Sequence, residues 1–213
     1  MKRFIVCSFV LSLIVSGVYM IVQPEEEKKY EKLESESKEA LALAELNDPK
    51  KESGSENKQE VTKLKDGTVG IVSIPSLKIN LAILEGATKE NLYKGATTLK
   101  ENQHMGEGNY SLAGHHMKDE TLFFSQLENI KEGNLIYLTD NEYIYIYKAE
   151  SKKTVHETQT SILDDHNKKE ITLITCDRAT STEYRTVVTG SFVDKIPYSE
   201  HVWKSKTEYN NTK

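Results

Sequence analysis

Ile171–Arg185, with the sequence ITLITCDRATSTEYR, is the stretch around which the rest of the chain is organised. Alternating β-branched and apolar residues lead into Cys176, and a polar loop then leads to a second strand-like run, Tyr184–Phe192 (YRTVVTGSF). Two such runs separated by a short loop predict a β-hairpin. Across this hairpin, Arg185 lies near Cys176 on the neighbouring strand. The pattern therefore predicts a thiol at a strand end with a guanidinium beside it.

The chain has two cysteines, Cys7 and Cys176, and Cys7 lies inside an amino-terminal apolar run. The soluble part therefore carries one unpaired cysteine, which excludes a disulfide framework and a multi-cysteine zinc site. Two interpretations of Cys176 remain open at this point, a buried structural thiol and a reactive nucleophile. A lone cysteine is more often structural, because free cysteine is among the most buried residue types. A nearby base and a pocket would favour the reactive interpretation.

The composition is that of one folded domain with additional terminal segments. The chain has 213 residues, of which 37% are hydrophobic and 29% charged, and this is enough for a single core after the termini are subtracted. The formal net charge is −5. No window combines clustered lysine or arginine with aromatic residues, so we exclude a nucleic-acid partner.

The amino terminus predicts an uncleaved membrane anchor over residues 1–23. Lys2 and Arg3 precede Phe4–Val22, a run without charge whose length matches the roughly 20 apolar residues that cross a bilayer. A cleaved signal peptide is the alternative, but the end of the run lacks a small-residue cleavage site. The positive-inside rule leaves Lys2 and Arg3 in the cytoplasm and the remainder of the chain outside. Residues 24–60, rich in Glu, Lys, Ser and Asn, are then a charged extracellular stalk.

Residues 61–197 form the predicted folded domain, because short alternating runs and turn residues follow one another there. The runs that predict strands are Gly70–Leu84, interrupted at Pro75, then Tyr110–Ala113, Leu135–Leu138, Tyr143–Ala149, Ile171–Cys176 and Tyr184–Phe192. The predicted fold class is mainly β, a closed seven- to eight-stranded barrel with one or two short helices, and a β-sandwich is the alternative. Thr88–Tyr93 predicts a helix with Thr88 as N-cap, and Phe123–Ile130 has helical spacing. Residues 198–213 are predicted to be a polar tail.

His115 is the histidine best placed to act as a base for Cys176. The soluble domain has six histidines, and most lie in polar surroundings that are typical of exposed side chains. His115 instead follows an apolar strand that ends at a glycine, so both His115 and Cys176 lie at strand ends. Two reactive side chains on one rim of a barrel make a site on a rigid scaffold. Arg185 is a candidate for stabilising an oxyanion, with a surface ion pair to Glu183 or Asp177 as the alternative.

Three separated motifs resemble those of sortases, the bacterial cysteine transpeptidases of the cell surface. They are Ala113-Gly114-His115, the run Leu173-Ile174-Thr175-Cys176 about sixty residues later, and an arginine nine residues after the cysteine. The segments Gly108–His116 and Tyr137–Asp140, together with the amino-terminal anchor, are similar to the class A, housekeeping branch. The resemblance covers about residues 67–193. It implies a sortase-type β-barrel and a catalytic cysteine.

The resemblance implies a transpeptidase that acts on a Leu-Pro-x-Thr-Gly (LPXTG) sorting signal. Cys176 would attack the Thr–Gly bond and hold the cleaved protein as a thioester. His115 would act as general acid for the leaving amine and as base toward the incoming amine. Arg185 would stabilise the oxyanion or position the substrate.

Neighbouring residues and partners receive roles from the same resemblance. Ala113, Ile174 and Thr175 would bind the substrate, and His116 would lie behind the reacting groups. The implied partners are surface proteins with a carboxy-terminal sorting signal and a peptidoglycan precursor whose amino group is the acceptor. The implied location is the cell membrane of a Gram-positive-type bacterium, with a single pass, a cytoplasmic amino terminus and an extracellular catalytic domain.

One departure from the family pattern concerns calcium. Some class A members bind calcium through carboxylates in the loop before the catalytic histidine. Counting back from His115, two of those positions are Lys100 and Gln103, and only Glu107 keeps a carboxylate. A lysine ammonium there can replace the ion electrostatically. We therefore expect no calcium requirement and no other cofactor.

Two other functions remain open from the sequence. A thiol hydrolase or peptidase would form the same thioester and release it to water. A non-catalytic, membrane-tethered adhesion or scaffold domain would use Cys176 only for packing. A Cys176→Ala variant separates the scaffold from the enzymes, because in an enzyme it keeps the fold and loses cleavage of a sorting peptide.

Overall fold

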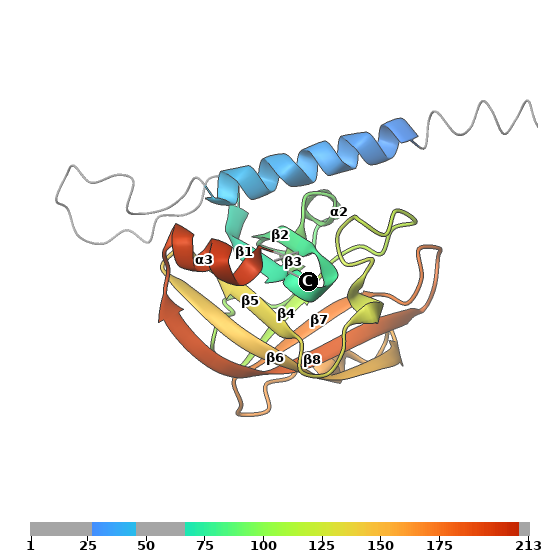
Figure 1. Cartoon of the computed structure of the whole chain (residues 1–213). Coiled ribbons are helices and arrows are strands. Elements are labelled where there is room, and N and C mark those ends of the chain that lie inside the picture. Colours follow the sequence, from blue (N-terminus) through green and yellow to red (C-terminus); the bar gives the residue numbers. More distant parts are fainter. Residues whose placement is uncertain (1–26, 46–66, 209–213) are drawn as a thin grey trace, which may run out of the picture. The chain divides into compact units, whose positions relative to one another are not determined.

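The computed structural model describes residues 27–45 and 67–208 (Figure 1). The chain divides into two compact units, residues 1–35 and 36–213. The first described range is a single helix, and the boundary between the two units falls within it. The predicted anchor over residues 1–23 lies outside the described residues. Within the described ranges, no helix has the length and apolar character needed to cross a membrane.

Eight strands of the described chain form a closed barrel, which confirms the predicted mainly β fold (Figure 1). They are β1 Thr68–Ile74, β2 Ile79–Leu84, β3 Ala96–Thr98, β4 Asn109–Ala113, β5 Leu135–Thr139, β6 Tyr143–His156, β7 Glu170–Cys176 and β8 Tyr184–Pro197. Short helices lie between or after them: η2 Pro75–Leu77, α2 Lys89–Leu92, η3 Leu127–Asn129, η4 Thr160–Leu163 and α3 Glu200–Thr207. Thr88 caps α2 as predicted, because its hydroxyl accepts a hydrogen bond from the Asn91 amide at 3.1 Å.

The order of strands around the barrel is β1-β2-β3-β4-β7-β8-β6-β5. The β7–β8 and β5–β6 pairs are antiparallel hairpins, as the sequence predicts. The β4–β7 pair is parallel and joins Ala113 to Ile174, which are about sixty residues apart. Parallel strands end at the same edge of a sheet, so the carboxyl ends of β4 and β7 lie side by side. This pair fixes the place of the candidate site.

The two faces of β7 serve different purposes. Leu112, Leu173 and Val188 are in register on three neighbouring strands and are fully buried in the barrel interior. Successive side chains of a strand point to opposite faces, so Ile174 and Val187 lie on the outer face. There they form a separate apolar cluster with Val155, and partly buried residues that include Leu99, Ile162 and Leu163 cover it. Cys176 lies on this outer face as well.

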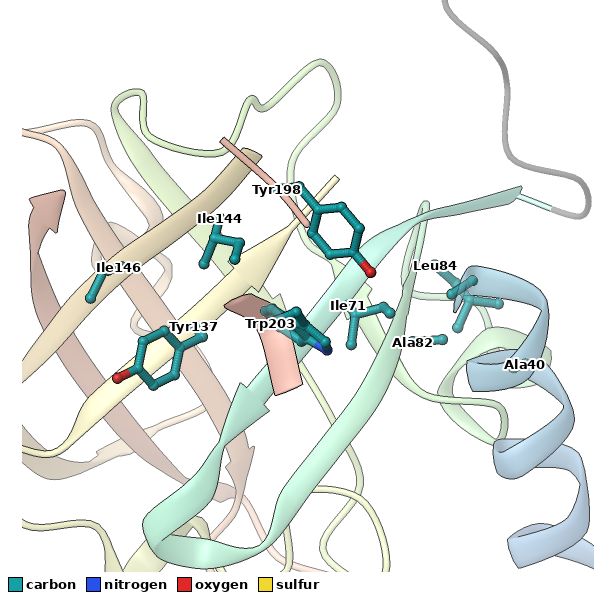
Figure 2. Packing of buried hydrophobic residues seen from close by; sticks show 10 residues of the cluster. Ala40, Ile71, Ala82, Leu84, Tyr137, Ile144, Ile146, Tyr198 and Trp203 are labelled. Carbon is teal, nitrogen blue, oxygen red and sulfur yellow. The ribbon is translucent and has the colours of Figure 1, made fainter. Parts of the chain in front are cut away.

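Part of the predicted polar tail folds into a helix. Residues 200–207 form α3, and the Ser199 hydroxyl caps the helix by accepting a hydrogen bond from the Val202 amide. Trp203 is only 4% exposed and belongs to a buried cluster with Ile71, Tyr137 and others (Figure 2). A single indole buries enough apolar area to anchor a helix whose other residues are mostly charged or polar. Because one buried residue anchors an otherwise polar helix, the sequence pattern predicted a polar tail.

Part of the predicted stalk also packs against the barrel. Ala40 and Ala44 are buried in the same cluster as Trp203 (Figure 2 labels Ala40). The Asn141 side-chain amide donates a hydrogen bond of 2.7 Å to the Ala44 carbonyl. Residues 36–45 are therefore a docked helix, whereas the sequence predicted a solvated spacer over this range. Alanines permit the close approach, and their weak apolar stripe is a poor signal in a charged segment.

Two smaller differences concern the predicted helix over residues 123–130 and the loop before β7. Only Leu127–Asn129 forms a single 3₁₀ turn, η3, and Phe123 adopts a positive φ of 52°, which ends helical geometry at that residue. The strand β6 extends to His156, beyond the predicted hairpin. The loop that follows contains η4, which covers the outer apolar cluster.

Candidate active site

Cys176 and Arg185 are direct cross-strand neighbours. They are paired in the antiparallel ladder of β7 and β8, one step beyond Thr175 and Thr186. Residues paired in register point to the same face of a sheet, with Cβ atoms roughly 5 Å apart. Cys176 is a free, half-buried thiol, and it lies on the outer face together with the buried Ile174. The predicted hairpin geometry is therefore confirmed.

The ladder between β4 and β7 continues past the end of β4. The Gly114 amide donates to the Ile174 carbonyl at 3.1 Å, and the Thr175 hydroxyl donates to the Gly114 carbonyl at 2.8 Å. These two bonds bring the start of the following segment level with Cys176. A side chain at Gly114 would place a Cβ only 2.7 Å from the Phe124 ring, so the position requires glycine.

His116 is bound to the backbone of the nucleophile. Its Nδ1 atom lies 2.8 Å from the Cys176 carbonyl oxygen. A carbonyl only accepts hydrogen bonds, so Nδ1 of this ring carries the proton. An isolated bridge between His116 and Phe123 fixes the backbone of the same segment. This placement supports the prediction that His116 lies behind the reacting groups.

His115 lies in an aromatic environment. The Tyr93 ring is 4.8 Å from the imidazole centroid at an interplanar angle of 36°, and the Phe123 ring is 6.1 Å away in an edge-on arrangement. The Nε2 atom is buried, and no described residue gives it a hydrogen bond. Burial lowers the pKa of His115 below its ordinary value of 6.5, because it disfavours the charged imidazolium. The uncharged form of the ring is therefore favoured.

The Arg185 guanidinium is held by a different set of partners. One nitrogen forms an ion pair with Glu157, and another donates 2.9 Å hydrogen bonds to the carbonyls of Thr182 and Tyr184. The ion-pair partner is thus Glu157, which follows β6, whereas the sequence analysis considered Glu183 and Asp177. The Arg185 side chain is 26% exposed and the Glu157 side chain 44%. Arg185 is thus the cross-strand neighbour of Cys176, and its side chain is partly open to solvent.

The three predicted substrate-binding residues divide between the two faces of the sheet. Ala113 and Ile174 are in register and share the outer face with Cys176. Thr175 points to the opposite face, is 3% exposed, and uses its hydroxyl to bind the Gly114 carbonyl. The prediction of a direct substrate contact does not fit this placement of Thr175. Alternation along the strand reverses its direction, and its observed contact joins β7 to the segment that carries His115.

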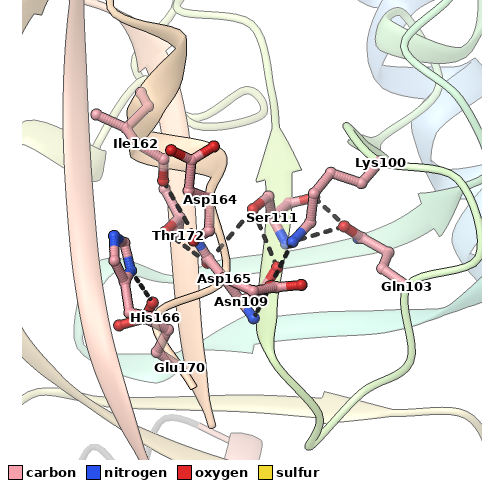
Figure 3. Close-up of polar contacts among 10 residues, drawn as sticks. All are labelled: Lys100, Gln103, Asn109, Ser111, Ile162, Asp164, Asp165, His166, Glu170 and Thr172. Carbon is pink, nitrogen blue, oxygen red and sulfur yellow. Dashed lines mark hydrogen bonds and ion pairs between the residues drawn. The ribbon is translucent and has the colours of Figure 1, made fainter. Parts of the chain in front are cut away.

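A polar network attaches the loop before β7 to β4 (Figure 3). Lys100 forms an ion pair with Asp165 at 2.8 Å, and the same carboxylate oxygen accepts a 2.7 Å hydrogen bond from the Asn109 amide. The Asn109 side chain donates to the carbonyls of Ile162 and Asp164 at 3.0 and 3.2 Å. The hydrogen bond from Lys100 is the main cause that lowers the pKa of Asp165. We call this set of contacts the loop latch.

The side chains at the loop latch do not fit a calcium site. Calcium needs six to eight oxygen ligands, several of them carboxylates, whereas Lys100 places an ammonium against the carboxylate of Asp165. Gln103 uses its amide to bind both the amide and the carbonyl of Ser111 (Figure 3). In the described part of the chain, no three His, Cys, Asp or Glu side chains group as metal ligands would. Calcium independence stays a prediction.

Four residues at the site were not identified from the sequence: Tyr93, Phe123, Glu157 and Asp165. Asp165 had a usable signal, since an acid in the loop before the cysteine strand is a natural partner for Lys100. Tyr93 and Phe123 had none, because loop conformations bring their rings to His115 and no sequence periodicity reports such contacts. An exposed glutamate such as Glu157 is common in loops and carries little information by itself.

Comparisons with known proteins agree with this architecture. A model described as the sortase domain matches residues 72–193. Sortase A of Listeria monocytogenes is 46% identical over 126 residues, which are 59% of this chain and 57% of that protein. Sortase A of Bacillus anthracis is 38% identical over 172 residues, which are 81% of this chain and 79% of that protein. The crystal structure of Listeria monocytogenes sortase A matches with a TM-score of 0.65 at 40% identity, over 68% of this chain and 100% of that one.

The match to the Listeria protein spans little more than half of its length, 57%, whereas the match to the Bacillus protein spans 79%. The domain match extends over more than half of the present chain and contains Ala113, Cys176 and Arg185. On this evidence the chain belongs to the sortase family of cysteine transpeptidases, with class A sortases among its relatives.

Proposed function

We propose that this chain is a membrane-anchored, extracellular cysteine transpeptidase that cleaves an LPXTG-type sorting signal between Thr and Gly. It then transfers the acyl product to an amino group of a cell-wall precursor. The observation that carries the proposal is the cross-strand pairing of Cys176 with Arg185 on the outer face of the barrel. It puts a thiol and a permanent cation side by side at a strand end. The amino-terminal run over residues 1–23 supplies the anchor in this proposal.

In the first step, the Cys176 thiol gives its proton to His115 and the sulfur attacks the threonine carbonyl carbon. Burial disfavours the charged imidazolium and so favours the neutral form of His115, which is the form that can accept this proton. Negative charge develops on the carbonyl oxygen, and Arg185 stabilises it. The C–N bond to glycine then breaks, and the imidazolium of His115 gives the proton to the departing amine. The sulfur–carbon bond of a thioester remains.

In the second step, an acceptor amine attacks the thioester carbon. His115 takes a proton from the amine as the new C–N bond forms, and the C–S bond breaks. The sulfur leaves as a thiolate and is protonated again by the imidazolium. The same imidazole thus serves as base and as acid in both steps.

The outer face supplies apolar contacts for the Leu-Pro end of the signal. Ala113 and Ile174 share this face with Cys176, and Leu99, Ile162 and Leu163 are partly buried around the same apolar cluster. The leucine and proline side chains of the signal are two apolar groups that would pack against this surface. The loop latch holds the segment that carries Ile162 and therefore shapes this surface.

Mass spectrometry of the purified full-length chain in detergent tests the proposal. Incubation with a peptide containing Leu-Pro-x-Thr-Gly should give a thioester adduct on Cys176 with the mass of the fragment that ends at Thr. Cys176→Ala should give no adduct while retaining the melting temperature. An added amine, such as oligoglycine or a diamino acid, should raise turnover and appear in the product.

Two outcomes would overturn parts of this proposal. If water alone consumes the thioester and no added amine enters the product, the chain is a hydrolase. If no adduct forms although iodoacetamide alkylates Cys176, the thiol is accessible and does not act on sorting peptides.

A further inference from the structure

Several side-chain hydrogen bonds attach the short helix α2 to the barrel. The Asn91 amide group donates to the carbonyls of Glu85 and Gly86 at 2.9 and 3.0 Å, and Thr88 caps the helix. The Gly86 amide donates to the Thr98 hydroxyl on β3 at 2.8 Å. These bonds fix the turn to the end of β2 and to β3. A residue that follows α2 is therefore presented in a defined position.

The residue that follows α2 is Tyr93, and its ring lies against His115. The two ring centroids are 4.8 Å apart with an interplanar angle of 36°, well within the range of aromatic contacts. Tyr93 is half-buried, and the ring contact with His115 accounts for part of this burial.

The other aromatic contact of His115 is held with comparable rigidity. Phe123 has a φ of 52°, a conformation that costs free energy for a bulky residue, and strain of this kind clusters at functional sites. The Phe124 amide donates to the His115 carbonyl at 3.0 Å, which fixes this segment to the histidine. Two rings from two separately fixed segments thus contact one imidazole. The Nε2 atom of that imidazole is buried and has no partner among the described residues.

We propose that Tyr93 is a positioning residue for His115: its ring fixes the orientation of the imidazole and keeps water from it, so that Nε2 meets the reacting groups. This inference rests on the proposed role of His115 as acid and base. The tyrosine touches no reacting atom in this scheme and acts only through the histidine. The ring carries the effect, so the phenol oxygen is dispensable.

The experiment compares Tyr93→Phe, Tyr93→Leu and Tyr93→Ala in the full-length chain. Tyr93→Phe should keep kcat within about twofold of the unchanged chain. Tyr93→Leu and Tyr93→Ala should lower kcat about tenfold or more with little change in KM, since a misplaced catalytic group costs up to about a hundredfold. Tyr143→Ala is the matched control. Tyr143 is also a half-buried tyrosine, and it is the first residue of β6, at the other end of that strand from His156. Melting temperatures show which variants remain folded.

A second readout does not depend on turnover. NMR titration of the His115 ring in a Cys176→Ala background should show its pKa rising toward the ordinary value of 6.5 when Tyr93 becomes Ala or Leu, and not when it becomes Phe. The background removes the thiol, which leaves Tyr93 itself and His116, bound to the residue 176 carbonyl, as the adjacent titratable groups.

Two results overturn the inference, and a third overturns the proposed function alone. An unchanged His115 pKa together with unchanged kcat in folded Tyr93→Leu shows that the ring does not position the histidine. Equal losses in Tyr93→Phe and Tyr93→Ala assign the effect to the hydroxyl. If the unchanged chain fails to cleave a sorting peptide but the pKa still rises in Tyr93→Leu, the contact is real and the proposed function alone fails.

Discussion

The two flanks of Cys176 are built on different principles. On the β4 side, His115 packs against Tyr93 and Phe123, and its Nε2 atom is buried. On the β8 side, a carboxylate and two backbone carbonyls hold Arg185, whose side chain is 26% exposed. Packing therefore fixes the His115 ring, whereas an ion pair and hydrogen bonds fix the Arg185 guanidinium. Substitutions that leave a cavity should therefore disturb the position of His115. Changes in ionic strength should disturb the contacts of Arg185.

The largest expected effects come from removing each flank. His115→Ala should lower kcat for a sorting peptide about 10² to 10⁴-fold, the usual contribution of general acid–base catalysis. Arg185→Ala should lower it about 10² to 10³-fold, as the loss of an oxyanion-stabilising donor does. Thermal melting separates the two flanks: His115→Ala leaves a cavity beside Tyr93 and should melt lower than Arg185→Ala. Equal melting temperatures, or an Arg185→Ala variant with full activity, would contradict the comparison.

The loop latch should have an intermediate effect. Lys100→Ala removes the ion pair with Asp165 and loosens the loop that carries Ile162, so KM should rise roughly two- to fivefold, the range for an exposed ion pair. Lys131→Ala, a change at an exposed loop lysine, is the control and should leave KM unchanged. A chelator should leave the activity of the unchanged chain intact, and a collapse of activity on chelation would show that a metal is required after all.

A smaller effect of opposite sign is expected at Glu157. Glu157→Gln removes the negative charge that opposes the Arg185 cation, while the Thr182 and Tyr184 carbonyls still orient the guanidinium. The turnover rate should rise up to about fivefold at low salt, and this gain should shrink at high salt because exposed charges are screened. Glu150→Gln, at an exposed position on β6, provides the matched control. A fall in turnover would mean that Glu157 is needed to orient the arginine.

The smallest effect is a pH dependence of stability. The pKa of His115 is lowered in the folded chain, so the unfolded chain binds more protons below its ordinary value of 6.5. The free energy of unfolding therefore falls as the pH drops from about 6.5 through the folded pKa, and this part is fully present above that window. Denaturant titrations of His115→Gln should lack this component, whereas His201→Gln, at an exposed position on α3, should retain it.

Much of the barrel is predictable from the sequence because its hairpins are local. The alternation around Cys176 predicts β7, β8 and the pairing with Arg185, since these residues are separated only by a short loop. His115 is predictable as a strand-end residue. The prediction that β4 and β7 end at the same level rests on the sortase resemblance instead. No periodicity in the sequence reports which distant strands pair in parallel.

The remaining misses have physical causes of three kinds. Trp203 is the buried residue of α3, and the run Ala40–Ala44 lies in an otherwise charged segment, so both segments look like solvated linkers. Tyr93 and Glu157 acquire their roles only through neighbours that are far away in sequence. Thr175 shows a third kind of cause. Side chains alternate between the two faces along β7, so the residue next to Cys176 points away from the face of the thiol.

The parallel pairing of β4 and β7 also determines when in folding the site can exist. The β5–β6 and β7–β8 hairpins close between neighbouring segments, whereas the β4–β7 seam joins residues about sixty positions apart. Long-range pairings pay a larger loop-closure entropy and form late. His115 reaches the level of Cys176 only through that seam. A chain in which this seam has not yet formed therefore carries Cys176 without His115 at its level.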